Sequence, residues 1–315
     1  DFLNSISLPS TISYAVMINA SDLINYEDGY ENAINILFSE KKDSPIDIIR
    51  IASHAGEIKE CRSIAIALKD LGYKVCLNIM QISSMDSNAI ANTSKDICSW
   101  NCVDVLYFAD SFGNMEPDLV SSVISTISSN WSGEMGIHTH DNKNQALGNS
   151  LKAIEQGVTY VDATILGMGR GAGNAKMETL LVEIVQRGLG KYFPDALFSL
   201  TLKEFGLLQK EYNWGPNIYY FLSAVHGIHP TFIQEMSADQ RYTSEQIFSA
   251  INFLKNADSS FYSNKSMIRA ISGNSGNENG DWSAKNWARA KDVLIIGSGP
   301  STKLYKDEII GYVKR

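Results

Sequence analysis

Short apolar runs rich in β-branched residues recur at intervals of about 25 to 35 residues through the first half of the chain. This spacing constrains the fold more than any other feature of the sequence. Amphipathic helical patterns lie between the runs, for instance Ile58 to Leu71 and Asn144 to Gln156, each followed by a glycine that ends it. Strand, helix and strand in steady alternation indicate parallel βαβ units, so the chain is predicted to be an α/β protein. The six candidate strands are Ile12–Ile18, Ile46–Ala52, Lys74–Ile79, Val103–Ala109, Met135–His138 and Tyr160–Ala163.

Two architectures suit such a series: an open doubly wound sheet and a closed (β/α)8 barrel. Polar residues follow several of the predicted strands, and both architectures place such residues where ligands bind. Six candidate strands are two fewer than a barrel needs. The polar segments are Arg50–His54, Asp110–Ser111, His138–Asn142 and Gly167–Asn174.

The pattern of residues changes along the chain of 315 residues, and we predict four segments from it. Residues 1–191 are expected to form the barrel part, and residues 192–271 a helical extension with helices over Leu202–Tyr212, Asn217–Val225 and Ser244–Lys255. Residues 272–290, rich in Gly, Asn and Ser, are a predicted linker. Residues 291–315 are predicted to begin a Rossmann-like unit, because a strand, a Gly-rich turn and an amphipathic helix follow one another there. That turn, Gly-Ser-Gly-Pro-Ser, departs from the full dinucleotide fingerprint.

Charge and composition narrow the range of partners. The net charge of −8 and the pI near 5.2 argue against a nucleic-acid backbone as partner and favour small molecules or proteins. No apolar run approaches the roughly 20 residues of a membrane span, and no signal peptide is recognisable, so we expect a cytoplasmic protein. The cysteines lack metal-site spacing and are expected to be reduced and mostly buried; they are Cys61, Cys76, Cys98 and Cys102.

The segment Gly-Ile-His-Thr-His-Asp-Asn, Gly136 to Asn142, carries the main chemical signal. Residues two apart in a strand point to the same side, so His138 and His140 can direct both imidazoles at one cation. They can equally cap a strand without binding an ion. The glycine-rich stretch that ends at Asn174 favours the first interpretation, because so many glycines suit a loop that closes over a ligand. It lacks the Gly-Lys-Ser/Thr sequence of a nucleotide-binding P-loop.

Several segments together resemble the metal-dependent aldolases, lyases and Claisen synthases of the DRE-TIM metallolyase superfamily, which includes the HMG-CoA lyases. Within it the likeness is greatest to the 4-hydroxy-2-oxovalerate aldolase subgroup, and it extends over most of residues 12 to 236. The segments that carry it are Ile48–His54, Tyr107–Gly113, His138–Asn142, Ala146–Ser150 and Val161–Glu178.

The resemblance implies a (β/α)8 barrel and a divalent metal ion (Mn, Zn, Co or Mg). It implies His138 and His140 as metal ligands, with His138 also near the substrate. Asn174, at the end of the glycine-rich loop, is a further candidate ligand. Ser111, which follows the Asp of the Ala-Asp-Ser segment, is expected to contact a 2-oxo acid.

Three further residues are expected in the site. Arg50, as a catalytic residue, and Asp110, as a substrate-binding or orienting residue, lie at strand ends on the same predicted face. His229 falls where the aldolases have a substrate-contacting tyrosine, and an imidazole there can exchange a proton near neutral pH. His226 is an alternative for that role, and both imidazoles can also be core histidines.

The resemblance also leaves a gap, because the Arg-Asp pair that the family carries on its first strand has no counterpart before Ile12. The two absent strands and this pair are explained together if about the first fifth of the native protein is missing from the sequence. We therefore expect a metal-dependent carbon–carbon lyase of the aldolase type, acting on a 2-oxo acid and an aldehyde and assembling as a homo-oligomer. The alternatives are a Claisen-type synthase that uses an acyl-CoA, and a non-catalytic barrel fused to a transferase domain.

Overall fold

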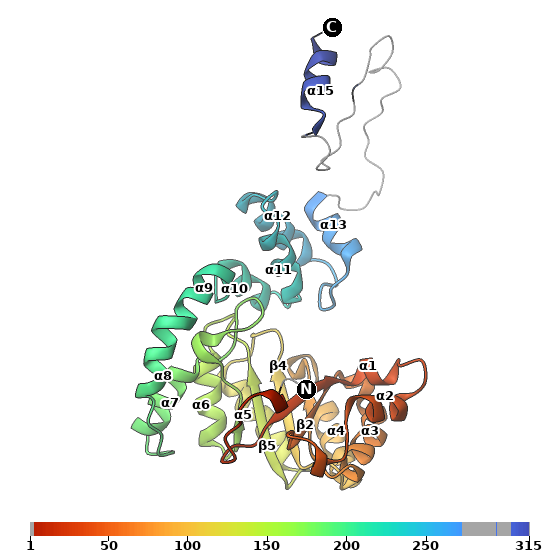
Figure 1. Ribbon diagram of the computed structural model, residues 1–315, viewed down its shortest axis with the longest axis vertical. Coiled ribbons are helices and arrows are strands. Elements are labelled where there is room, and N and C mark those ends of the chain that lie inside the picture. Colours follow the sequence, from red (N-terminus) through yellow and green to blue (C-terminus); the bar gives the residue numbers. More distant parts are fainter. Residues whose placement is uncertain (1–2, 273–293, 295–303, 315) are drawn as a thin grey trace. The chain divides into compact units, whose positions relative to one another are not determined.

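All six strands expected from the apolar runs are present in the structure, a computed structural model that describes residues 3–272, 294 and 304–314. They form one parallel sheet in the order β1-β2-β3-β4-β5-β6 (Figure 1). A doubly wound sheet reverses its strand order at a switch point, whereas a barrel follows the order of the sequence. The fold is therefore of the TIM-barrel type. The strands are β1 (Ala15–Asn19), β2 (Ile48–Ser53), β3 (Lys74–Ile79), β4 (Val105–Asp110), β5 (Glu134–Thr139) and β6 (Tyr160–Val161).

Helices cover the outer face of this sheet. The predicted helix after β2 is α3, which ends at Asp70, and Gly72 follows it with a φ of +92°, a conformation that suits glycine. The α-helices of this part are α1 (Ala20–Ile24), α2 (Tyr30–Leu37), α3 (Ile58–Asp70), α4 (Ser87–Trp100), α5 (Pro117–Ser128), α6 (Ala146–Glu155) and α7 (Met177–Gln186). Short 3-10 turns are η1 (Leu3–Ser5), η2 (Lys41–Asp43), η3 (Ala55–Glu57), η4 (Ile82–Ser84) and η5 (Ile165–Gly167).

Alternation along each strand gives the sheet two different faces. One face packs its aliphatic residues against the helices and forms the main core, which includes Ile49, Ile51, Leu77, Phe108 and Ile137. The opposite, inner face carries a small apolar cluster of Cys76, Val105 and Tyr107, with Ile48 and Tyr160 packed against it. The inner face also holds the polar side chains of Arg50, Asn78 and His138, so it is the face on which chemistry can occur.

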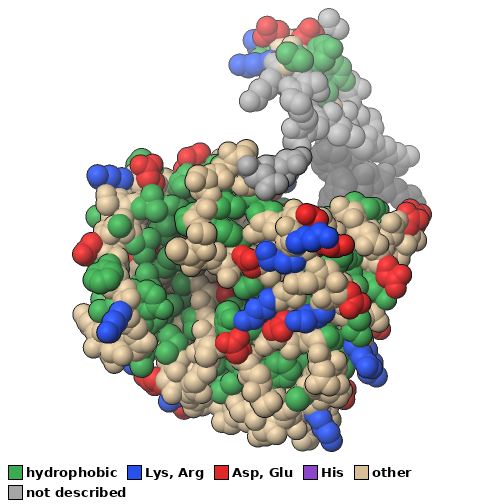
Figure 2. All heavy atoms as spheres, turned by 60° about the horizontal axis from the view of Figure 1, so that its bottom comes forward, with side chains coloured by type: hydrophobic (Ala, Val, Ile, Leu, Met, Phe, Trp, Pro, Cys, Tyr) green, Lys and Arg blue, Asp and Glu red, His purple; other side chains and the backbone are tan. Residues whose placement is uncertain are grey.

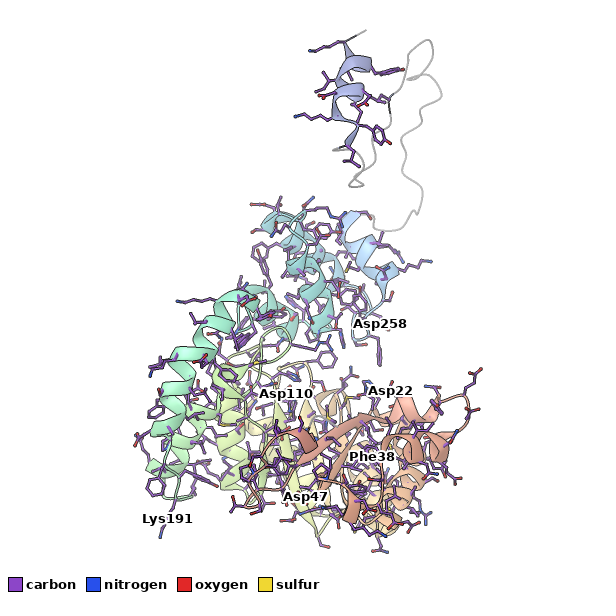
Figure 3. All side chains as sticks on the ribbon, viewed as in Figure 1. Asp22, Phe38, Asp47, Asp110, Lys191 and Asp258 are labelled. Atoms are coloured by element: carbon purple, nitrogen blue, oxygen red, sulfur yellow. The ribbon has the colours of Figure 1, made fainter. Side chains whose placement is uncertain are left out.

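The two ends of the sheet also differ. Figure 3 shows Asp47, just before β2, at one end and Asp110, the last residue of β4, at the end nearest α10 and α11. Ion pairs lie at the strand starts: Lys74 of β3 pairs with Glu134 of β5 (2.9 Å), and Asp104, just before β4, pairs with Lys69 in the last turn of α3 (3.0 Å). Figure 2 turns the strand-start end toward the viewer, and there acidic and basic side chains are interspersed. This end has the features of a stabilising face, which leaves the carboxyl ends of the strands for a site.

The region after α7 is helical, as predicted, and has a core of its own. That core includes Phe232, Ile233, Met236, Ile251 and Leu254. The helices are α8 (Asp195–Leu200), the π-helical turn η6 (Thr201–Phe205), α9 (Gly206–Tyr212), α10 (Ile218–Val225), α11 (Pro230–Ala238), α12 (Ser244–Leu254) and α13 (Asn264–Ser272). Aromatic residues of this region differ in burial: the indole of Trp214 is largely covered and donates a hydrogen bond to the Leu166 carbonyl (3.0 Å), whereas Tyr212 is exposed.

Residues 274–315 form a separate unit. Its helix α15 (Lys306–Val313) coincides with the amphipathic helix predicted there. The predicted linker and the strand and Gly-rich turn of the Rossmann-like unit fall almost entirely outside the described residues, so that part stays a prediction. No helix among the described residues combines the length and apolarity that crossing a bilayer requires.

Gly136 of β5 tests the packing of the inner face. A Cβ at this position would lie 2.4–2.5 Å from the ring carbons of Tyr107, closer than the packed ring can accept. Gly136→Ala is therefore expected to lower the free energy of unfolding by about 1–3 kcal/mol, as overpacked cores do. Gly56→Ala is the control, because no atom lies within 4 Å of the added methyl group. Urea denaturation of both variants measures the difference, and equal stabilities would contradict the packing account.

Candidate active site

His138 and His140 lie side by side on the inner face of the sheet at the end of β5. Their ring centroids are 4.8 Å apart and their planes meet at 81°. The alternation of strand residues brings the two imidazoles together as the sequence indicates. The pair is thus fixed by the backbone and not by a flexible loop.

Each imidazole has its Nδ1 atom already occupied. Nδ1 of His138 lies 2.7 Å from Oδ2 of Asp162, and Nδ1 of His140 lies 2.9 Å from the main-chain oxygen of Asp110. Both partners are acceptors, so each Nδ1 carries the proton and donates it. The lone pair of each Nε2 is left free, which is the arrangement that metal-binding histidines show.

The carboxylate of Asp162 also binds Arg50. Nη1 of Arg50 lies 2.6 Å from the same Oδ2 atom, and its guanidinium stacks on the ring of Tyr107, 4.0 Å from the centroid. Burial by itself raises the pKa of Asp162, but the hydrogen bond from His138 and the charge of Arg50 outweigh it and hold that pKa below its ordinary value. Asp162 is therefore an anion that links β2, β5 and the end of β6.

The surroundings of His140 keep it neutral. Burial lowers the pKa of His140 to about 4, and the neighbouring His138 and Arg170 act in the same direction. Asp110, whose main chain accepts from His140, is 0% exposed. Burial raises the pKa of Asp110 to about 7, although the main-chain amides of Asn114 and Met115 donate to its carboxylate. Its carboxylate thus holds the turn after β4, and Asp110 orients His140 through its carbonyl group.

A cavity of about 380 Å³ opens at the carboxyl ends of the strands, and we call it the His140 cavity. Of the residues predicted for the site, it includes Ser111, His140 and His229. Its wall is made of Asn19, Ser21, His54, Met80, Gln81, Ser111, His140, Asn142, Arg170, Gly171, Ala172, His229, Pro230, Thr231 and Gln234. The last residue of β1, the residues that directly follow β2, β3, β4 and β5, the glycine-rich loop and α11 contribute to it, in the manner of barrel active sites.

Two further polar groups in this cavity have defined hydrogen-bond roles. The hydroxyl oxygen of Ser111 accepts the amide proton of Gln81 (2.8 Å), so its own proton is available to a ligand. Gln81 has a φ of 54°, in the left-handed region. Nδ1 of His229 accepts the amide proton of Thr231 (3.3 Å), and burial followed by the charge of Arg170 lowers the pKa of His229.

The glycine-rich loop brings Asn174 beside the histidine pair. Asn174 forms an antiparallel bridge with His140, and its Nδ2 donates to the Met168 carbonyl (3.1 Å), which leaves Oδ1 free. Gly173 has a φ of +78°, and a Cβ there would lie 2.2 Å from the carbonyl oxygen of Gly167. The loop can therefore fold back on itself only with glycine at this position.

These donors suit a divalent ion but do not complete its coordination. Two imidazole Nε2 atoms and an amide oxygen can bind Mn, Zn, Co or Mg, and these metals differ in their preference for nitrogen over oxygen ligands. Within residues 3–272, 294 and 304–314, no three His, Cys, Asp or Glu side chains are grouped closely enough to hold an ion. The acidic ligand that the resemblance implies is not among them.

Sequence reasoning located part of this arrangement and missed part. It named His138, His140, Asn174, Ser111 and His229, which the structure gathers at one end of the sheet. Arg50 lies deeper, in its ion pair. Asp162, His54 and Arg170 were not assigned roles. The signal for Asp162 was available, because it continues the inward alternation two residues after Tyr160 of β6.

Known proteins match this chain in sequence and in fold. The HMGL-like family model matches residues 49–203. The N-terminal domain of a "putative aldolase" from Bacteroides vulgatus, a solved structure, is 30% identical, with a TM-score of 0.62 over 76% of this chain and 77% of that one. The HMG-CoA lyase of Bacillus subtilis, 15% identical with a TM-score of 0.53 over 67% of this chain and 74% of that one, shares the fold.

Curated relatives carry a similar signal over a shorter stretch. The 4-hydroxy-2-oxovalerate aldolase of Carboxydothermus hydrogenoformans is 33% identical over 141 residues, 45% of this chain and 42% of that protein. The aldolase of the same name from Geobacillus genomosp. 3 is 30% identical over 150 residues, 48% of this chain and 44% of that protein. The chain thus spans less than half the length of these two relatives. Taken with the structural match, these likenesses show that the chain belongs to the HMGL-like family of the DRE-TIM metallolyase superfamily.

The low pKa of His140 has a consequence for stability in the metal-free protein. The unfolded chain binds a proton at His140 near the ordinary pKa of 6.5, whereas the native protein does so only near 4. Between these values acid favours the unfolded state, so the free energy of unfolding falls as pH falls from about 7 to about 4. Asp110, with its raised pKa, contributes with the opposite sign.

His140→Gln isolates the imidazole contribution. We expect the stability of the wild type relative to this variant to decline steadily between pH 7 and pH 4.5 in urea denaturation with a chelator present. A difference that does not change with pH would contradict the assignment.

Proposed function

We propose that the protein is a divalent-metal-dependent aldolase that makes or breaks a carbon–carbon bond next to a 2-oxo acid, in the manner of 4-hydroxy-2-oxovalerate aldolase. The observation that carries the proposal is the histidine pair, with both Nδ1 atoms occupied and both Nε2 atoms free, beside a cavity at the carboxyl ends of the strands. The names of the curated relatives support the same reaction class.

His138 and His140 are the residues that would hold the ion, with Asn174 as a further ligand through its free Oδ1. When bound, a divalent ion acts as a Lewis acid toward a 2-oxo acid and contributes several kcal/mol of charge stabilisation. Asp162 and the Asp110 carbonyl hold the two rings in the required tautomer. Arg50 serves the site by fixing Asp162.

The remaining residues would bind the organic substrate and move its protons. The free proton of the Ser111 hydroxyl can be donated to the carboxylate of the 2-oxo acid. In cleavage the 4-hydroxyl loses its proton, the C3–C4 bond breaks, and its electron pair stays on C3 as the enolate of pyruvate, which is then protonated at C3. Because Nδ1 of His229 accepts from Thr231, its Nε2 is a donor that can bind the oxygen becoming the aldehyde. His54 lines the same cavity and is the imidazole placed to accept the hydroxyl proton.

The reaction itself is tested by pyruvate release from 4-hydroxy-2-oxovalerate, followed with lactate dehydrogenase, after loading the full-length protein with Mn, Co, Zn or Mg. We expect turnover that depends on the ion and is abolished by a chelator. No pyruvate release with any of the four ions would overturn the proposal and favour the non-catalytic barrel.

The ligand assignment is tested by metal affinity, measured by calorimetry with Mn. His138→Ala is expected to lower the affinity at least tenfold, because it removes a ligand. Asp162→Asn is expected to lower it about 10- to 100-fold, because it removes the charge that the His138 Nδ1 proton faces. His226→Ala is the matched control, since His226 is exposed at the end of α10. Equal affinities in all four proteins would refute His138 as a ligand.

A further inference from the structure

Arg170, in the glycine-rich loop, carries a positive charge that its protein partners do not neutralise. Its Nη2 donates to the hydroxyl oxygen of Thr231 (2.9 Å) and its Nε to the amide oxygen of Gln234 (3.2 Å), and both partners belong to α11. None of the ion pairs among the described residues includes Arg170. The two neutral hydrogen bonds hold the guanidinium in place and leave its charge for another group.

The position of Arg170 is between two cavities. It lines the His140 cavity and also a second cavity of about 590 Å³, which we call the Trp214 cavity. Gly171 and Gln234 line both as well, so the two spaces adjoin one another. The wall of the Trp214 cavity is Met168, Gly169, Arg170, Gly171, Leu208, Tyr212, Asn213, Trp214, Tyr220, Gln234, Ser237 and Ala238. A ligand held at the histidine pair can extend past Arg170 into this second space.

Tyr220 gives the Trp214 cavity a second unused donor. Its side chain is 5% exposed, and no hydrogen bond to its hydroxyl group is found within the described residues. A Cβ at Gly171 would lie 3.2 Å from that hydroxyl, so the group is next to the residue that follows Arg170. The hydroxyl group lies at the surface of the cavity, so its proton can be donated to a ligand in place of water.

From these contacts we infer that Arg170 and Tyr220 form a binding site for a second anionic group of the substrate, remote from the 2-oxo acid. This inference rests on the proposed function and specifies its substrate class. The preferred substrate is a 4-hydroxy-2-oxo acid whose aldehyde half ends in a carboxylate or a phosphate, and the aliphatic part between the two anions passes along the apolar wall near Trp214. Cleavage then yields pyruvate and an aldehyde that carries the anion.

The carboxylate of the 2-oxo acid itself has a different partner. The Ser111 hydroxyl follows β4, next to the strand that carries the histidine pair, and its proton is free. Arg170 is instead held by α11 and shared with the Trp214 cavity. The two anionic ends of the proposed substrate are thereby assigned to separate elements.

Binding of two 2-oxo acids of equal length tests the inference without turnover. The probes are 2-oxoadipate, which has a terminal carboxylate, and 2-oxohexanoate, which does not; neither has a 4-hydroxyl group to permit cleavage. Calorimetry on the full-length, Mn-loaded protein is expected to show about 10- to 100-fold tighter binding of 2-oxoadipate, as a charge-assisted hydrogen bond provides. Arg170→Met is expected to remove this preference, and Tyr220→Phe to reduce it. Arg170→Lys is expected to retain part of it.

Arg241→Met is the matched control, because Arg241 is exposed and paired with Asp239 in its own loop. It should retain the full preference, and circular dichroism should confirm that every variant is folded.

The outcomes of this experiment distinguish a failure of the inference about the second anion from a failure of the proposed aldolase function. Equal affinity of the wild type for the two probes overturns the inference and leaves the aldolase proposal intact. Failure of both probes to bind overturns the proposed function and the inference with it. If Arg170→Met still prefers 2-oxoadipate, or if its affinity for both probes falls equally, Arg170 does not bind the second anion.

Turnover then distinguishes the two anions. Aldol addition of pyruvate to succinic semialdehyde, glyceraldehyde 3-phosphate and pentanal is compared by kcat/KM. A preference of tenfold or more for either anionic aldehyde over pentanal, lost in Arg170→Met, supports the inference and identifies carboxylate or phosphate. Equal values for all three aldehydes overturn it.

Discussion

The carboxylate of Asp162 is the interaction on which the site depends. It accepts from His138 of β5 and pairs with Arg50 of β2, while its own chain position fixes the end of β6. Because the three groups are largely covered, the loss of one would leave the others poorly compensated, and such losses are costly in protein interiors. The same ion pair that holds the inner face of the sheet together therefore sets which nitrogen of His138 carries the proton.

The glycine-rich loop and the helical region also contact the carboxyl ends of the strands. The glycine-rich loop after β6 folds over the end of β5 through the bridge between His140 and Asn174. Trp214, which precedes α10, donates to the carbonyl of Leu166 at the base of that loop. The helical region is thereby attached to the loop, and α11 supplies His229 to the His140 cavity. Strand residues and helical residues meet there through a loop that only glycines allow.

Much of the fold could be predicted from the sequence because strand formation here depends on local patterns. Each apolar run coincides with a strand to within a few residues, and helix α3 ends beside Gly72, as the pattern indicates. The choice between an open sheet and a barrel was not local, since it depends on which strands pair. The strand order settled it. The π-helical turn between α8 and α9 has no pattern in the sequence that we recognise.

Without the family resemblance, the site was predictable only where its members lie close together in the chain; the roles of Ser111, Asn174 and His229 rested on that resemblance. His138 and His140 share a strand, so alternation predicts their common face. The partnership of Asp162 with Arg50 spans 112 positions and follows from the curvature of the sheet, which no local pattern encodes. For Asp110, a polar residue at a strand end suggested contact with substrate, yet its side chain is fully covered and accepts from the main-chain amides of Asn114 and Met115. A strand end tells where a residue lies but not to which side its side chain turns.

The hydrogen bonds from Arg170 to Thr231 and Gln234 attach the guanidinium to a different element from the one that carries the imidazoles. The imidazoles and their acceptors belong to the sheet and the segments that directly follow its strands, where a substitution disturbs several neighbours at once. The guanidinium is positioned by two side chains one turn apart on a peripheral helix, which can be exchanged with little effect on the strands. The part of the cavity that holds the guanidinium is therefore built separately from the strands that hold the imidazoles.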